Sequence, residues 1–213
     1  MPAKVIDLQE RVTRRANSNR KQQVDNAELH LFNTCSWDIE TSNLDADFGI
    51  ILCSSIKPLG KETTTIRLDE GPTYADAPWD DKWLVKQIRD QLEEYMIVIG
   101  WNHVSFDLPF INSRLLKHGL KPIDTSTMCM VDMLWASRYR MRIHSNRLDS
   151  VIEYLGTTTQ KSPLLGDLWC RAMAGDQSAL DKIVEHNVRD VVALEEVSEK
   201  LSRFVKLQYR LVR

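Results

Sequence analysis

The sequence predicts an α/β protein in which a mixed β-sheet is flanked by helices. Three strand-like segments, 32–40, 49–56 and 63–68, follow one another through short connections, which favour an antiparallel meander. A fourth segment, 96–101, is short and wholly apolar, as expected for a strand buried on both faces. Helical segments lie on either side of this strand in the sequence. Antiparallel strands followed by alternating helix and strand indicate a mixed sheet with helices on its faces.

The first half of the chain is assigned from residue types and turn signals. Residues 63–68 are rich in β-branched side chains, which favour strands. Prolines mark a loop over 72–78. The helix predicted next covers 81–94, because its apolar residues recur at helical spacing, and Asp80 is its expected N-cap.

The second half is predicted to be mainly helical. Gly119 and Gly156 are expected to end two of the helices, and a polar loop is expected over 157–165. The predicted helices cover 105–118, 128–142, 147–155 and 178–204.

Length and composition describe an ordinary globular protein of 213 residues with a formal net charge of −2. This charge gives no general attraction to nucleic acid, so such binding would need a local patch. The four cysteines show no paired spacing, which argues against a zinc site and favours a reducing compartment. Because no apolar stretch approaches the roughly 18 residues that span a bilayer, we expect a soluble cytoplasmic protein with no membrane partner.

Residues 1–30 differ from the rest of the chain and are predicted to form a basic N-terminal arm. Six Lys and Arg residues stand against two acidic residues between positions 1 and 22. Val5, Leu8 and Val12 have helical spacing, so a short amphipathic helix is one expectation. Two interpretations stay open: an arm that grips phosphates, or a solvated and partly disordered terminus.

The first candidate site is Asp38 and Glu40, which lie one residue apart in the first predicted strand. Side chains alternate along a strand, so both carboxylates project from one face while Trp37 and Ile39 point the other way into packing. Like charges on one face repel unless a cation lies between them, and Mg²⁺ and Mn²⁺ prefer such oxygen ligands. The alternative is a strand end with two solvated acids.

The second and third candidate sites lie on helices. Asp107 is near the start of the helix that follows the buried strand, where ligands of α/β sheets gather, but the helix dipole alone also favours an acid there. His186 and Asp190 are four residues apart on the last helix, and they flank its apolar stripe. Without function they would form a weak surface pair. The stripe consists of Leu180, Ile183, Asn187, Val191, Leu194 and Leu201.

Taken together, the three sites resemble the three exonuclease motifs of the DEDD superfamily of 3′→5′ exonucleases. The motifs are Asp38-Ile39-Glu40-Thr41, then Asn102-x-x-x-Phe106-Asp107, then His186-Asn187-x-x-Asp190. Their order and their places on strand and helix match the superfamily from about residue 31 to about residue 201. The resemblance implies a ribonuclease H-like fold with a five-stranded mixed sheet, and an exonuclease domain over 31–213.

The resemblance also implies a metal-dependent hydrolase that removes nucleotides from a nucleic-acid 3′ end. Two divalent cations, Mg²⁺ or Mn²⁺, are the implied cofactors, with Asp38 bridging both. Single-stranded DNA is the favoured substrate. The implied metal ligands are Asp38, Glu40, Asp107 and Asp190; the implied catalytic set adds His186; and the implied substrate contacts are Thr41, Asn102 and Phe106.

His186 departs from the pattern of the superfamily. One class has Tyr in the motif Tyr-x-x-x-Asp, and the other has His with a gap one residue longer. This chain has His186-x-x-x-Asp190, which is the residue of one class at the spacing of the other. His186 is therefore a candidate general base, a group that orients water, or neither.

Other interpretations remain open at this point. The same fold could act on RNA, cut internally, or serve as an inactive nucleic-acid-binding module, and a polymerase or repair partner is unknown. Trp101 is expected in the core. His103, His118 and His144 are expected to be surface or capping residues. Positive charges that could follow phosphates are Lys121, Arg138, Arg140, Arg142, Arg147 and Lys161.

Overall fold

A computed structural model describes residues 32–159 and 166–205. Its centre is a five-stranded sheet in the order β3-β2-β1-β4-β5. β1, β2 and β3 pair antiparallel, whereas β4 pairs parallel with β1 and β5 pairs parallel with β4. The predicted mixed five-stranded sheet is therefore confirmed. The strands are β1 (Thr34–Thr41), β2 (Ile51–Pro58), β3 (Thr64–Arg67), β4 (Ile97–Gly100) and β5 (Cys129–Asp132).

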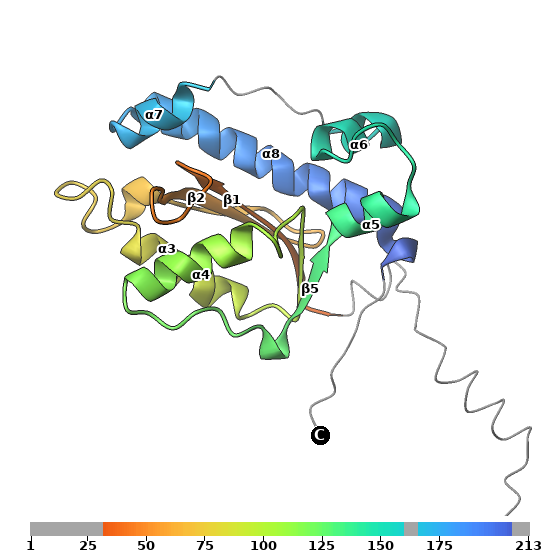
Figure 1. Cartoon of the computed structure of the whole chain (residues 1–213), viewed down its shortest axis with the longest axis horizontal. Helices are drawn as coiled ribbons and strands as arrows, with labels where there is room; N and C mark the ends of the chain where they lie inside the picture. The colour runs from red at the N-terminus through yellow and green to blue at the C-terminus, as the bar shows by residue number, and fades with distance from the viewer. Residues whose placement is uncertain (1–31, 160–165, 206–213) are drawn as a thin grey trace, which may run out of the picture.

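Helices cover both faces of the sheet (Figure 1). α3 and α4 lie on one face, and the long α8 crosses the other with α7 beside its first turns. α5 and α6 pack near the β5 edge. The helices are α3 (Lys82–Leu92), α4 (Asp107–Lys117), α5 (Met133–Arg140), α6 (Leu148–Leu155), α7 (Leu168–Met173) and α8 (Gln177–Leu201), with short 3₁₀ turns η1 (Leu68–Glu70), η2 (Thr125–Thr127) and η3 (Ser202–Phe204).

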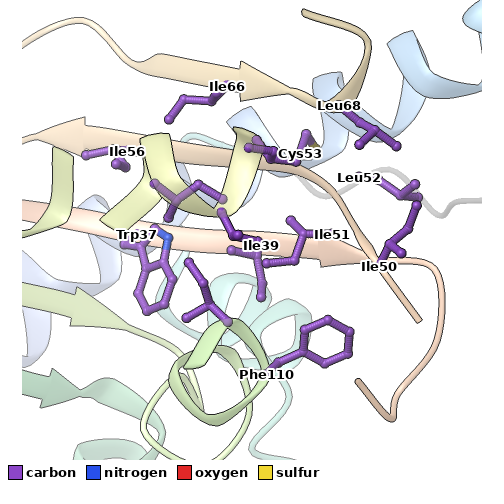
Figure 2. Packing of buried hydrophobic residues seen from close by; sticks show 14 of the residues in the cluster. Trp37, Ile39, Ile50, Ile51, Leu52, Cys53, Ile56, Ile66, Leu68 and Phe110 are labelled. Carbon is purple, nitrogen blue, oxygen red and sulfur yellow. The ribbon is translucent and has the colours of Figure 1, made fainter. Parts of the chain in front are cut away.

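β1 shows the predicted alternation of its side chains. Trp37 and Ile39 are 0% and 5% exposed, and Figure 2 shows both of them among the apolar side chains of β2 and α4, near Phe110. Asp38 and Glu40 occupy the alternate positions and are only partly buried. Pairing with β2 shifts register between Glu40 and Thr41. Such an irregularity bends a strand and often re-aims side chains next to a site.

The core consists of two apolar clusters that α8 connects. The first joins β1 and β2 to α3, α4 and the first half of α8, and the second joins β4 to α6 and the second half of α8. Every residue of the predicted α8 stripe is buried. Each buried Leu or Ile contributes about 1.5–3 kcal/mol, so this stripe holds α8 firmly across the sheet.

Residues 128–142 were predicted as one helix, and this prediction is wrong. Cys129–Asp132 forms the edge strand β5, and only Met133–Arg140 is helical. Asp132 separates the two elements, because its Oδ1 accepts a hydrogen bond from Leu134 N at 3.0 Å and caps α5. A short apolar run fits either structure, and pairing with β4 decides for a strand. α7 was also not predicted.

Asp80 was expected to cap α3, but the N-cap residue is Asp81. The Asp81 side chain is fully buried and binds Arg114 of α4, with Arg114 Nη2 2.8 Å from Asp81 Oδ1 and Nε 2.9 Å from Oδ2. Ile51 N donates to the same Oδ2 at 3.0 Å, and His118 Nε2 lies 2.7 Å from Oδ1. We call Asp81, Arg114 and His118 the Asp81 cluster; it ties β2, α3 and α4 together.

Several predictions fall outside the described residues. These are the basic arm over 1–30, Lys161, and most of the polar loop after Thr159. The last helix ends at Leu201, with η3 extending the turn to Phe204. Within the described ranges, no helix combines the length and the apolar character needed to cross a bilayer.

Candidate active site

The C-terminal half of β1 and the middle of α8 bring four of the predicted site residues together. Asn187 Nδ2 donates to Asp38 Oδ2 at 2.7 Å, which fixes α8 to the acidic face of β1. His186 Nε2 lies 3.9 Å from Glu40 Oε1 and 3.7 Å from Asp190 Oδ2. The side chains of His186, Glu40 and Asp190 are 11%, 14% and 11% exposed. Two carboxylates thus approach one imidazole at the border between core and solvent.

Asp107 joins this group from the opposite layer. It is the first residue of α4, is 3% exposed, and its Oδ1 accepts a hydrogen bond from Ile39 N at 3.2 Å. Ile39 lies between Asp38 and Glu40, so Asp107 is attached to the backbone of the first motif. Burial raises the pKa of Asp107 to about 7, while the N–H groups of Ile39 and Asp107 oppose the rise and the Asp132 carboxylate adds to it.

The loop before α4 is held in a conformation that few residues adopt. Asn102 has φ 63°, in the left-handed region, and Asn is one of the residues that tolerate it. Asn102 N donates to Asp132 Oδ1 at 2.9 Å, and Asn102 O accepts hydrogen bonds from Ser105 N and Phe106 N at 3.0 Å each. Asp132 at the end of β5 therefore fixes the loop from which α4 starts.

His103 is part of the core, which corrects the prediction of a surface position. It is 0% exposed, and its ring meets Trp37 edge-on with centroids 6.2 Å apart. A Cβ on Gly100 would lie 2.2 Å from His103 Cγ, so residue 100 has to be glycine while this ring is present. His118 belongs to the Asp81 cluster, and His144 is exposed as expected.

The three predicted substrate contacts lie in different surroundings. Asn102 lines a pocket beside Asp38 and Asp190. Thr41 lies at the register shift of β1, and its Oγ1 donates to Asn43 O at 2.8 Å. Phe106 is half-buried and packs against Phe110, with ring centroids 5.8 Å apart. The structure thus places Asn102 beside the acids, whereas much of the Phe106 ring packs against the hydrophobic core.

The pocket has a cavity volume of about 680 Å³, and we call it the active-site pocket. Asp38 and Asp190 line it from β1 and α8, and the hydrogen-bond donors Arg138, Asn146 and Arg147 line it from α5 and the segment before α6. Asn146 is oriented by Ser137, whose Oγ donates to Asn146 Oδ1 at 2.7 Å. The residues that line the active-site pocket are Asp38, Trp101, Asn102, Leu134, Arg138, Asn146, Arg147, Leu148, Asp149 and Asp190.

The donor set of the predicted site fits hard divalent cations. All four predicted ligands are carboxylates, and such oxygens suit Mg²⁺ and Mn²⁺. Asp107 supports this fit, because a buried carboxyl whose pKa burial has raised is stabilised as an anion by a nearby cation.

A different group satisfies a purely geometric test for metal ligands. In the described part of the chain, ligand atoms of Asp80, Asp81 and His118 lie within 4.8 Å of one another. Asp81 is already compensated by Arg114 and by Ile51 N–H, however. The guanidinium already balances the charge of the buried carboxylate, so we interpret this group as an ion-pair network rather than a metal site.

Sequence reasoning missed the roles of three residues of the site. Asn187 was treated as part of the apolar stripe of α8, although a polar residue in such a stripe signals a buried hydrogen bond. Asp132 was placed inside a helix, and Asn146 was not considered. All three act on predicted site residues or line their pocket.

This sheet order, with acids of β1 and α8 lining one pocket and Asp107 of α4 bound to the backbone of β1, is that of the ribonuclease H-like class. The chain belongs to the RNase H superfamily, whose family pattern matches residues 35–202. The resemblance to DEDD exonucleases of ribonuclease H-like fold is thereby confirmed.

Two polymerases are similar to parts of this chain. Over 151 residues it is 28% identical to DNA polymerase III PolC-type from Ureaplasma parvum, a match that covers 62% of this chain and 10% of the polymerase. The family B DNA polymerase from the archaeon Pyrobaculum calidifontis has the same fold, with a TM-score of 0.63 and 16% identity over 81% of this chain and 27% of that one. The chain thus spans a tenth and about a quarter of these two proteins.

Proposed function

We propose that this protein is a two-metal-ion-dependent 3′→5′ exonuclease that acts on single-stranded DNA. The observation that carries the proposal is the joint position of the four acids. Asp38 and Asp190 share a pocket, Glu40 and Asp190 both approach His186, and Asp107 is attached to the backbone between Asp38 and Glu40. Both named relatives are DNA polymerases, which favours DNA over RNA.

The four acids would hold the cations from three elements. Asp38 would contribute to holding both ions, Glu40 and Asp190 would help hold the ion that activates the attacking water, and Asp107 would help hold the ion that stabilises the leaving oxygen. A pair of ions supplies an activated nucleophile and charge stabilisation for both oxygens of an in-line displacement. Asn187 would orient Asp38 through its 2.7 Å hydrogen bond.

His186 is proposed to accept a proton from the attacking water. It lies on the same helix face as Asp190, and its Nε2 is within 4 Å of both Glu40 and Asp190. An imidazole titrates near neutrality, which suits a general base. The neighbouring carboxylates would stabilise the imidazolium that forms.

The hydrogen-bond donors that line the pocket are proposed to bind the DNA backbone. Arg138 and Arg147 are exposed, and both line the pocket together with Asp38 and Asp190. A guanidinium matches the geometry of a phosphate and can donate two hydrogen bonds to it. The oriented Asn146 offers its amide N–H groups in addition. Acids for the cations and donors for the phosphates would thus line one pocket.

Oligonucleotides labelled at the 3′ or the 5′ end test this proposal. With Mg²⁺ or Mn²⁺ we expect release of labelled mononucleotides from the 3′ label at once and stepwise shortening of the 5′-labelled strand, and no reaction in EDTA. Products of internal cleavage at the earliest time points would indicate an endonuclease. Faster cleavage of RNA than of DNA would show that RNA is the preferred substrate. If the protein binds the oligonucleotide but releases no mononucleotides with metal, and Asp38→Ala behaves as the wild type, the protein is a nucleic-acid-binding module and not an exonuclease.

A further inference from the structure

α5 separates two concave surfaces. Leu134 and Arg138 line the active-site pocket, whereas Trp135, Tyr139 and Arg140 line a second cavity of about 570 Å³ on the other side of the helix. We call this second cavity the α5 groove. The edge strand β5, with Met128 before it, also lines this cavity, as do Phe204 and Val205 after α8.

Two aromatic rings in the α5 groove are exposed and stacked. Trp135 and Tyr139 are 46% and 66% exposed, and their ring centroids lie 5.2 Å apart with an angle of 11° between the planes. Phe204 adds another ring that is 43% exposed. Gathered exposed aromatic side chains mark binding surfaces more often than scattered ones do. The stacked pair offers a flat face on which a further ring can stack.

The charge beside these rings is positive. Arg138 and Arg140 lie in the last turn of α5 and Arg142 follows it, all three exposed. In the described parts of the chain, Arg140 forms no salt bridge. The acid that lines the groove, Asp132, is engaged by the backbone N–H groups of Asn102, Leu134 and Val104. The groove therefore combines aromatic faces with the Arg140 guanidinium, which no carboxylate of the described residues engages in a salt bridge.

This combination fits single-stranded nucleic acid better than a protein segment. Bases stack on aromatic rings with about 1–3 kcal/mol each regardless of sequence, and Arg side chains follow the backbone. α5 is about 10 Å wide with its side chains, so a strand leaving the active-site pocket reaches the groove within a few nucleotides. Arg138, on the wall of that pocket, and Arg140, in the groove, bracket this path.

We propose that the α5 groove is a second binding site for single-stranded nucleic acid, which holds the strand on the 5′ side of the nucleotide in the active-site pocket. The inference rests on the proposed exonuclease function for its polarity, but the binding site itself does not depend on hydrolysis. It makes affinity depend on strand length, because a short strand fills the pocket alone and a longer one also reaches Trp135 and Tyr139.

Fluorescence anisotropy with 5′-labelled oligo(dT) of 4 and 16 nucleotides in EDTA tests this site. For the double variant Trp135→Ala/Tyr139→Ala, we expect the affinity for the 16-mer to fall at least about tenfold, while the affinity for the 4-mer changes less than twofold. Tyr139→Phe keeps the ring and should bind as the wild type. Trp79→Ala is the matched control, because Trp79 is 64% exposed in the loop before α3.

Thermal melts of the variants verify that they are folded, as expected for exposed positions. An unchanged 16-mer affinity in the double variant would overturn the proposal. So would a wild type that dimerises in sedimentation experiments through the same two residues, because the groove would then bind a second copy. If the wild type shows the length-dependent binding but no metal-dependent hydrolysis, the proposed exonuclease function is wrong, whereas the proposed binding site in the α5 groove is supported.

Discussion

Two groups of acids lie on opposite faces of the sheet, and they differ in what surrounds them. In the Asp81 cluster, a buried guanidinium, an imidazole and a backbone N–H all converge on one carboxylate. On the other face, Asp38 accepts a hydrogen bond from the neutral amide of Asn187. Glu40 and Asp190 approach the same histidine beside an open pocket. An acid that is paired with a buried positively charged side chain stabilises the fold. Acids that gather at a pocket fit a cation from solution.

Asp190→Asn gives the largest expected effect. The change removes one ligand charge from the proposed metal site, which is worth several kcal/mol of transition-state stabilisation. We expect kcat/KM on a 3′-labelled oligonucleotide to fall by about 10³-fold or more. Asp80→Asn is the matched control from the other face, and it should keep activity within about twofold. Equal losses in both variants would erase the distinction between the two groups.

Asp81→Asn should act on stability instead of activity. It leaves Arg114, which is 2% exposed, without its partner carboxylate, and breaking a buried ion pair costs about 3–5 kcal/mol. Urea denaturation measures this loss. The rate per folded molecule, taken well below the melting temperature, should stay near that of the wild type. A stable but inactive variant would place Asp81 in the chemistry.

His186→Ala tests the proposed general base. We expect the rate to fall by about 10²-fold, at the lower end of what a positioned base contributes. The acid limb of the pH–rate profile should also flatten, because the group that must lose its proton there is gone. Melting curves control for folding. An acid limb with an unchanged slope would count against this role for His186.

His103 gives a smaller effect, on the pH dependence of stability. Burial lowers its pKa to about 3 in the folded protein from 6.5 in the unfolded chain. Between these values only the unfolded chain binds the proton, so the free energy of unfolding falls as the pH drops below about 6.5. For this residue alone the loss is roughly 2 kcal/mol between pH 6.5 and pH 5. Urea denaturation of His103→Asn over this range should show a shallower slope; an identical slope would contradict the assignment.

The sequence predicted those parts of the fold that follow from local periodicity. The alternation of Trp37, Asp38, Ile39 and Glu40 and the apolar stripe of α8 both depend on the regular spacing of side chains, and both appear as expected. The prediction for residues 128–142 failed because a run such as Met-Cys-Met-Val has neither the alternation of a strand nor the periodicity of a helix. Pairing with β4 across the sheet decides its structure, and no local pattern contains that pairing.

The candidate site shows the same division. Asp38, Glu40, His186 and Asp190 were found from spacing together with the resemblance to a known family, and the structure brings them together. The roles of Asn187, Asp132 and Asn146 are contacts between distant segments, so they emerge only once the chain is folded. Asp81 and His118 show the converse: acids and histidines near one another need their partners in view before a function can be assigned.

Mn²⁺ binding measured by calorimetry tests the central claim most directly. We expect the wild type and Asp80→Asn to bind two Mn²⁺ ions alike, and Asp38→Asn, which loses the proposed bridging ligand, to lose binding of both. The measurement needs no substrate, so it separates metal binding from catalysis. Unchanged Mn²⁺ binding in Asp38→Asn together with loss of binding in Asp80→Asn would contradict the account, since it would place the metal site on the other face of the sheet.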